Sequence, residues 1–461
     1  MTPVIAAPRL TAVEVSERQS PMIVPLLALL GFAMTILPYA IVSSDPGVWQ
    51  FGATLAFIDF VAFGLAIVGV RRFFERIRSR QLHSVEWAGL GLLAVLTVTL
   101  ALHPSLRGIV LVVRLGCCLT IADLIGTTES RNRVLLIKGL GAASAAQCLI
   151  AVAQRITGSA LGLGALGETA IPFRPGYPVP TGTMRDAYPL AAFGLFVAAL
   201  TAVALTSGWI WGRFAWVVLG SGGVLAGLSG SRTALLTVAA IFGACCITRA
   251  APRNYRGLES TGEGVVEPGQ WCLTTTTKVS LTSSTRRTLG VGAVVVLAFG
   301  ICAAFSSPLW LRRTTNISTS GGGVVVASND VTNGRSALTE QALGLLRTHP
   351  FVGVGPGNYS TALRATPELA RKSPENQIQP VHNMVLMALT ESGLLVVPAL
   401  LAVFVTLGRL VVRTRRSSLP LFAAIVPFLM LDLVFWFYPE GLVMVAIAIG
   451  FAISSAADQS N

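Results

Sequence analysis

The residues of this chain best suited to chemistry begin with a histidine–asparagine pair. His382 and Asn383 open a long apolar segment that follows a polar stretch. A neutral imidazole placed where lipid, water and a loop meet can accept a proton from a hydroxyl group near neutral pH. The alternative for His382 is a structural role as the first residue of an interfacial helix.

Arg232 is the sharpest single candidate for binding an anion. It lies in the sequence GLSGSRTALL, at the expected start of another apolar helix. An arginine there opposes the helix dipole, but its guanidinium and the free backbone N–H groups of the helix start would both stabilise a bound phosphate. The alternative is an interfacial arginine that extends toward the lipid headgroups.

Three further arginines are candidates for substrate binding. Arg174 and Arg185 lie at the two ends of the run RPGYPVPTGTMRD, and Arg335 begins an expected amphipathic helix. For each of them, the alternative is an ordinary solvated surface position. The formal net charge of +13 is explained by basic residues that flank membrane helices, so a nucleic-acid partner is not expected.

The composition predicts which elements position these residues. Hydrophobic residues make up 53% of the chain and charged residues only 12%, whereas about a quarter of an average soluble protein is charged. Apolar runs of roughly 18 or more residues predict an all-α, polytopic membrane protein. About twelve spans are expected, covering residues 22–43, 48–70, 85–102, 106–126, 133–154, 187–206, 209–228, 232–248, 289–305, 382–408, 419–436 and 440–456.

Basic residues in the connections predict the orientation of these spans. With twelve spans, the main basic clusters fall on one side, which the positive-inside rule makes cytoplasmic. The protein is therefore expected in the plasma membrane, with the N-terminal tail 1–21 and the C-terminal tail 457–461 both in the cytoplasm. The clusters occupy residues 71–80, 131–133, 249–287 and 409–416.

Three long segments interrupt the membrane regions 22–305 and 382–456. Residues 155–186 are expected outside, and residues 306–381 form a large outer loop between the ninth and tenth spans. Residues 249–288 are rich in Thr, Ser and Gly and are expected to form a flexible cytoplasmic loop without chemistry.

The second half of the large outer loop contains an expected amphipathic helix. Its apolar residues recur at helical spacing, and His349-Pro350 is expected to end it. The sequence GVGPGN at 353–358 is then predicted to form a tight turn, because its glycines and proline exclude a regular helix. The apolar face comprises Leu338, Ala342, Leu345 and Leu346.

Helical geometry places two more residues of the tenth span. Gly393 follows His382 by eleven residues, close to three turns, so it is expected on the same face, where a glycine lets another helix or a lipid tail approach. Glu391 is expected on the opposite face, roughly 13 Å deeper, as a packing or hydrogen-bonding residue.

Charged residues inside the spans are expected to need partners, since each costs about 2.5–3.5 kcal/mol near the bilayer centre. Asp59 and Arg114 are expected to pair between the second and fourth spans, and Asp123 is a further costly charge. The seven cysteines have no spacing that suggests zinc, and no Gly-rich phosphate loop with a lysine is present. Neither a metal nor a cofactor is expected.

Four motifs in this order resemble the O-antigen ligase/polymerase family of bacterial membrane glycosyltransferases. That family is also similar in having about twelve helices, cytoplasmic termini and a large outer loop before the His-Asn helix. The motifs are GSRTALL at 230–236, NGR at 333–335, HPFVGVGPGNY at 349–359 and HN…LTESGLL at 382–395.

This resemblance implies metal-independent transfer of a glycan from a polyprenyl-diphosphate carrier to an acceptor hydroxyl on the outer face of the plasma membrane. The partners would be the lipid-linked glycan donor, a glycan or glycolipid acceptor and the bilayer. Arg232 would hold the diphosphate, with Arg174 or Arg185 as the second basic contact. His382 would act as general base or position the acceptor, and Asn383 matches the family residue beside it.

A different class, a flippase or other transporter of lipid-linked glycans, is the alternative. Transporters place polar sites near the membrane midplane and often consist of repeated halves. No clear internal repeat is present here, and the candidate residues cluster on the expected outer face. The sequence therefore favours an enzyme of polysaccharide assembly, with ligase and polymerase activities both open.

Overall fold

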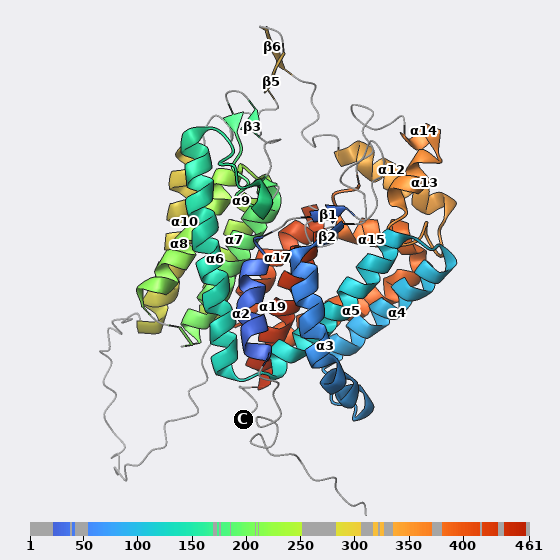
Figure 1. Ribbon diagram of the computed structural model, residues 1–461, viewed down its shortest axis with the longest axis horizontal. Helices are drawn as coiled ribbons and strands as arrows, with labels where there is room; N and C mark the ends of the chain where they lie inside the picture. Colours follow the sequence, from blue (N-terminus) through green and yellow to red (C-terminus); the bar gives the residue numbers. More distant parts are fainter. Residues whose placement is uncertain are drawn as a thin grey trace, which may run out of the picture.

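The computed structural model describes a bundle of apolar helices with short hairpins and a small helical region at one end (Figure 1). The residues described are 22–36, 39–41, 54–168, 173–174, 177–184, 186–207, 209–210, 212–250, 283–305, 317–320, 323–326, 335–370, 380–414, 417–431 and 438–457.

The bundle is formed by apolar helices of 11 to 28 residues, and the bounds of many of them agree closely with the expected spans. They are α2 (Ile23–Ala33), α3 (Phe57–Arg78), α4 (Ser84–Leu102), α5 (Leu106–Thr127), α6 (Ser130–Thr157), α7 (Ala187–Thr206), α8 (Arg213–Ser229), α9 (Arg232–Ala250), α10 (Ser283–Phe305), α16 (Val397–Arg413), α17 (Leu419–Leu431) and α19 (Pro439–Ala457).

The remaining elements are short. The helices are η2 (Gly164–Leu166), α12 (Arg335–Thr348), α13 (Tyr359–Arg364), α14 (Pro367–Ala370), α15 (Met384–Ser392) and η4 (Gly393–Val396). Three antiparallel hairpins pair β1 (Tyr39–Ile41) with β2 (Thr54–Ala56), β3 (Phe173–Arg174) with β4 (Tyr177–Pro178), and β5 (Ile317–Ser320) with β6 (Gly323–Val326).

The helices confirm the class of an all-α membrane protein. Within the described residues, six helical segments are long and apolar enough to cross a membrane, and α15, η4 and α16 count among them as one segment. Shorter apolar helices, including α2, α8, α9 and α17, accompany them. The number twelve and the sidedness of the loops stay predictions.

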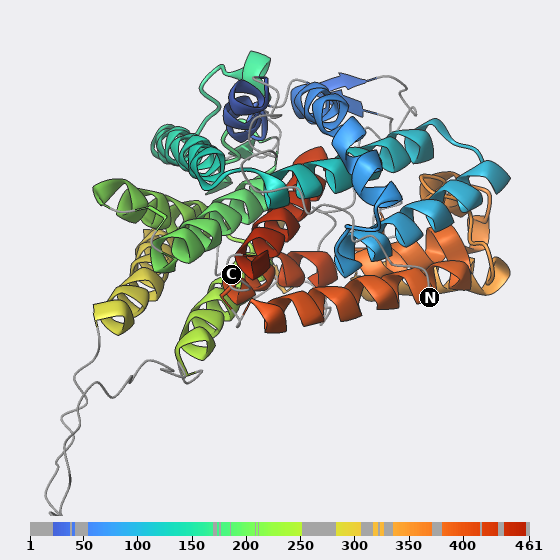
Figure 2. The same ribbon diagram turned by 90° about the horizontal axis from the view of Figure 1, so that it is seen from below.

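The centre of the bundle is α7, whose apolar stretch Ala187–Leu205 is 94% buried. It packs closely on α8, because a Cβ atom added at Gly222 would lie 2.5 Å from the carbonyl oxygen of Gly194. Small residues that let backbones approach are the usual means by which membrane helices associate. In both views α8 to α10 lie at one end of the molecule and α12 to α16 at the other (Figures 1 and 2).

The structure corrects the boundary of the second expected span. α3 begins at Phe57 rather than 48, and it continues to Arg78, through the segment expected to be a loop. The helix persists because Phe73 is buried and Arg71 pairs with Glu75 one turn away.

This extension gives the buried carboxylate Asp123 of α5 a partner. Arg76 reaches back from the end of α3 and pairs with Asp123 and, at 3.7 Å, with Glu86 of α4. The sequence suggested that Asp123 is an isolated charge inside a span. The structure shows instead that it has a cationic partner. It belongs to an ion network that joins α3, α4 and α5.

Candidate functional site

The His-Asn pair lies just before α15 rather than inside it. Asn383 is the N-cap residue: its Oδ1 atom accepts a hydrogen bond from the backbone N–H of Leu386 at 2.9 Å. His382 precedes this cap and is half-buried. The expectation that His382 begins the helix is therefore wrong by two residues, since the first helical residue is Met384.

The helix itself ends after only nine residues. Gly393 adopts a φ of 63° and begins a short 3₁₀ turn, after which the chain becomes α-helical again in α16. A Cβ atom at Gly393 would lie 2.3 Å from the carbonyl carbon of Phe351. The glycine does permit a close approach, but the approaching group is the backbone at Phe351 and Val352, not another helix or a lipid tail.

The segment that approaches this break is residues 349–358, here called the strap. Four backbone hydrogen bonds join it to the break, two in each direction. They satisfy peptide groups that an interrupted membrane helix would otherwise leave without partners. The bonds run from Val354 to Thr390 (3.1 Å), from Gly355 to Glu391 (2.7 Å), from Leu394 to Pro350 (2.7 Å) and from Leu395 to Phe351 (3.1 Å).

The strap is the tight turn expected from GVGPGN. Gly353, Gly355 and Gly357 all have left-handed φ values, of 69°, 90° and 76°. Side chains complete the connection: Glu391 Oε1 accepts from the N–H of Gly357 at 2.9 Å, which confirms the hydrogen-bonding role expected for Glu391.

The strap also reaches a third element, the turn between α4 and α5. The Ser105 hydroxyl donates to the carbonyl of Pro356 at 2.6 Å, and the Asn358 amide donates to the carbonyl of His103 at 3.1 Å. A short loop segment thus joins α15 to the turn between α4 and α5, which lies about 250 residues earlier in the sequence.

The amphipathic helix expected before the strap is present as α12. Leu338, Ala342 and Leu345 are buried as expected, whereas Leu346 is half-buried. The hydroxyl of Thr390 on α15 donates to the Ala342 carbonyl at 3.5 Å. α12 therefore packs on the same short helix that the strap holds.

Tyr359, the first residue of α13, directly follows the strap. Its side chain is fully buried, and its hydroxyl has no hydrogen-bond partner among the described residues. Burial raises the pKa of the Tyr359 hydroxyl, and the negative charge of Glu391 raises it further. Tyr359 stays protonated at neutral pH and cannot serve as a base.

Arg232 lies where the sequence placed it, on the first residue of α9. Gly230 ends α8 with a φ of 60°, and two buried serines build the turn. Ser229 Oγ accepts from the N–H of Ser231 at 3.1 Å, and Ser231 Oγ caps α9 by accepting from the N–H of Ala234 at 3.3 Å. The half-buried Arg232 thus stands at a capped helix start.

α9 and α15 share a neighbour, since both pack against α17. The helix that carries Arg232 and the helix that directly follows His382 are therefore parts of one packed unit. Arg335 is the first residue of α12, and the backbone of Arg174 pairs with Tyr177. The side chains of Arg174 and Arg335 and all of Arg185 lie outside the described residues.

The chain just before Arg185 is held by two glutamines that the sequence analysis did not single out. Gln147 on α6 accepts from the Thr183 N–H at 2.9 Å and donates to its hydroxyl at 2.7 Å. Gln154, two turns further along α6, accepts from the N–H groups of Thr181 and Gly182. Their spacing of seven residues in an apolar helix was the available signal.

A metal site would need a cluster of histidine, cysteine or acidic side chains. Across the part of the chain that the structure describes, no group of three such residues could hold a metal ion. Metal-independent catalysis stays a prediction.

The helical bundle, its interrupted helix and the strap define a multi-pass membrane protein with a small domain at one end. A family model described as O-antigen ligase matches residues 217–401, a range that contains Arg232, the strap and His382. The match confirms the resemblance to the O-antigen ligase/polymerase family over these residues. No curated protein matches the chain in a sequence search.

Proposed function

We propose that the protein transfers a glycan from a polyprenyl-diphosphate carrier to an acceptor hydroxyl on the outer face of the plasma membrane. The single observation that carries this proposal is the strap bound to the break after α15. It supports a rigid position for the segment bearing His382 and Asn383, within the stretch that matches the O-antigen ligase model.

In the proposed reaction the acceptor oxygen attacks the anomeric carbon of the donor sugar. The bond between this carbon and the diphosphate oxygen breaks, and the hydroxyl proton passes to His382. Arg232 and the start of α9 stabilise the charge that develops on the polyprenyl diphosphate. Arg174 or Arg185 supplies the second cation, while Arg335 and the Asn383 amide bind the glycan.

The test uses purified protein and a polyprenyl-diphosphate-linked oligosaccharide in the presence of EDTA. Released polyprenyl diphosphate and the size of the glycan product are measured for the wild type, Arg232→Ala and His382→Ala. Loss of a general base is expected to lower the rate by about 10²–10⁴-fold. His103→Ala is the matched control, because His103 is exposed and contacts the strap through its backbone carbonyl.

Each outcome bears on the proposal. Turnover by the wild type and the control, with failure of both variants, supports it; a ladder of products indicates a polymerase and a single shifted band a ligase. Full turnover by both variants would remove Arg232 and His382 from the site. Binding of the donor by the wild type without its consumption would instead favour the transporter alternative.

A further inference from the structure

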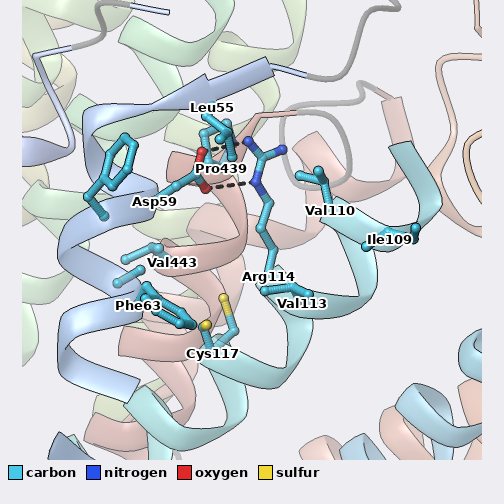
Figure 3. A pocket seen from close by; sticks show the side chains of 13 residues that line it. Leu55, Asp59, Phe63, Ile109, Val110, Val113, Arg114, Cys117, Pro439 and Val443 are labelled. Atoms are coloured by element: carbon cyan, nitrogen blue, oxygen red, sulfur yellow. Dashed lines mark hydrogen bonds and ion pairs between the residues drawn. The ribbon is translucent and has the colours of Figure 1, made fainter. Parts of the chain in front are cut away.

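A groove separate from the candidate site runs between α3 and α5, with α19 behind it (Figure 3). Its cavity volume is about 210 Å³, below the 300–1,000 Å³ typical of pockets for compact small molecules. The lining is apolar except for one ion pair and two thiols. It comprises Leu55, Asp59, Phe60, Ala62, Phe63, Ile109, Val110, Val113, Arg114, Cys117, Cys118, Pro439 and Val443.

The groove opens sideways from the bundle. Phe60 and Phe63 on one rim, and Ile109 and Val113 on the other, are large apolar side chains exposed by about half or more, with Phe60 at 63% and Val113 at 49%. In a multi-pass membrane protein such rims contact lipid hydrocarbon. A narrow apolar slot of this size fits a length of one alkyl chain.

One end of the groove carries a charged pair. The Arg114 guanidinium donates to both oxygens of Asp59, each at 2.7 Å, as expected from the sequence. Asp59 lies in the first turn of α3, where its Oδ2 also accepts from the N–H of Ala56. The pair is thus near the helix end, and its side chains stay 12–14% exposed on the groove wall.

Ionisable residues in a helix able to span a membrane, such as Arg114 in α5, often mark ligand sites, and this pair stays partly exposed on the wall of an apolar groove. The pair is formally neutral, with the cation and the anion side by side. A ligand with one negative and one positive group complements both members. A purely anionic ligand would bring a second negative charge toward Asp59.

We propose that this groove binds a single zwitterionic phospholipid. One acyl chain fills the slot between α3 and α5, the phosphate lies beside Arg114, and the headgroup ammonium lies beside Asp59. This proposal is independent of glycan transfer, because none of the lining residues belongs to the candidate catalytic site.

Native mass spectrometry of the full-length protein in detergent tests the proposal. Phosphatidylethanolamine, phosphatidylglycerol and polyprenyl phosphate are titrated, and apparent dissociation constants for the first bound molecule are compared. Val113→Trp fills the slot from an exposed position and is expected to weaken phosphatidylethanolamine binding about tenfold. Leu149→Trp adds the same ring to another exposed helix face, at 73% exposure, and is expected to leave binding unchanged.

Asp59→Asn tests the headgroup assignment. Removing the carboxylate leaves Arg114 as a net positive charge, so the variant is expected to prefer phosphatidylglycerol. Equal binding by the two tryptophan variants would overturn the groove as the site. Preference of the wild type for phosphatidylglycerol or for polyprenyl phosphate would overturn the zwitterionic occupant. Thermal unfolding checks that Val113→Trp remains folded.

Discussion

Two regions of this molecule are held together by different kinds of contact. At the break after α15, the strap is bound through backbone hydrogen bonds and three glycines in left-handed conformations. Between α3 and α5, the connection is made by side chains, the bidentate pair of Asp59 and Arg114. The first arrangement depends on the path of the backbone and the second on matched charges, so they should respond to substitution in different ways.

The largest effect is expected from Gly393→Ala. The added methyl group would overlap the Phe351 backbone at 2.3 Å, and the positive φ strains any residue with a Cβ. The loss in free energy of unfolding is expected to be about 4 kcal/mol, with loss of glycan transfer. Chemical denaturation in detergent measures it. Gly408→Ala, also in this helical segment but with nothing within 4 Å, should be nearly neutral; equal effects would refute the close-approach argument.

The ion pair should show the next largest effect, and one that a second substitution relieves. Arg114→Leu leaves the Asp59 carboxylate without its cation and is expected to cost about 3 kcal/mol. The double variant with Asp59→Asn should cost less than the sum of the single variants. Unfolding measurements on the four proteins give the coupling. Strict additivity would show that the pair seen in Figure 3 contributes no interaction energy.

Glu391 combines the two kinds of contact, because its side chain accepts a hydrogen bond from the backbone of the strap. Glu391→Ala leaves the Gly357 N–H without its acceptor and is expected to cost about 2 kcal/mol. Glu391→Gln keeps an oxygen acceptor and should recover much of this loss and of the kcat. Comparable defects in the two variants would mean that the charge, rather than the hydrogen bond, is what matters.

The smallest change in stability is expected at Asn383, and it separates capping from substrate binding. Asn383→Ala should lose about 1 kcal/mol with the N-cap bond. Asn383→Asp keeps the capping oxygen and should retain stability, yet it loses the amide N–H donors proposed to bind the glycan. A raised KM in the Asp variant supports the binding role. Unchanged kinetics would leave Asn383 with the capping role alone.

Local patterns were enough to predict a substantial part of this structure. The spacing of Leu338, Ala342 and Leu345 predicted the buried face of α12, and the glycines of the strap predicted its turn. The cost of buried charge predicted that Asp59 would pair with Arg114. Each of these depends on a short stretch of chain or on a small number of possible partners.

Other contacts between distant segments escaped prediction. The glycine in LTESGLL is compatible with a helix end, but nothing local shows where the broken peptide groups find their partners, which lie in the strap some forty residues earlier. The same holds for Gln147, whose partner Thr183 lies 36 residues away. The length of α3 was also missed, since its last turns are stabilised by an ion pair between Arg76 and Asp123 of another helix.

The sequence by itself therefore determined that this protein is an apolar helical bundle, that the candidate residues Arg232 and His382 lie at helix starts, and that it resembles the O-antigen ligases. Hydropathy and glycine content act within each segment, so they can be read without knowing the fold. Only the tertiary structure showed that the apolar helix is interrupted after α15 and that the strap supplies hydrogen-bond partners for the peptide groups at this break. An unpaired peptide group in the membrane costs several kcal/mol, and only the folded chain shows which group pairs with it.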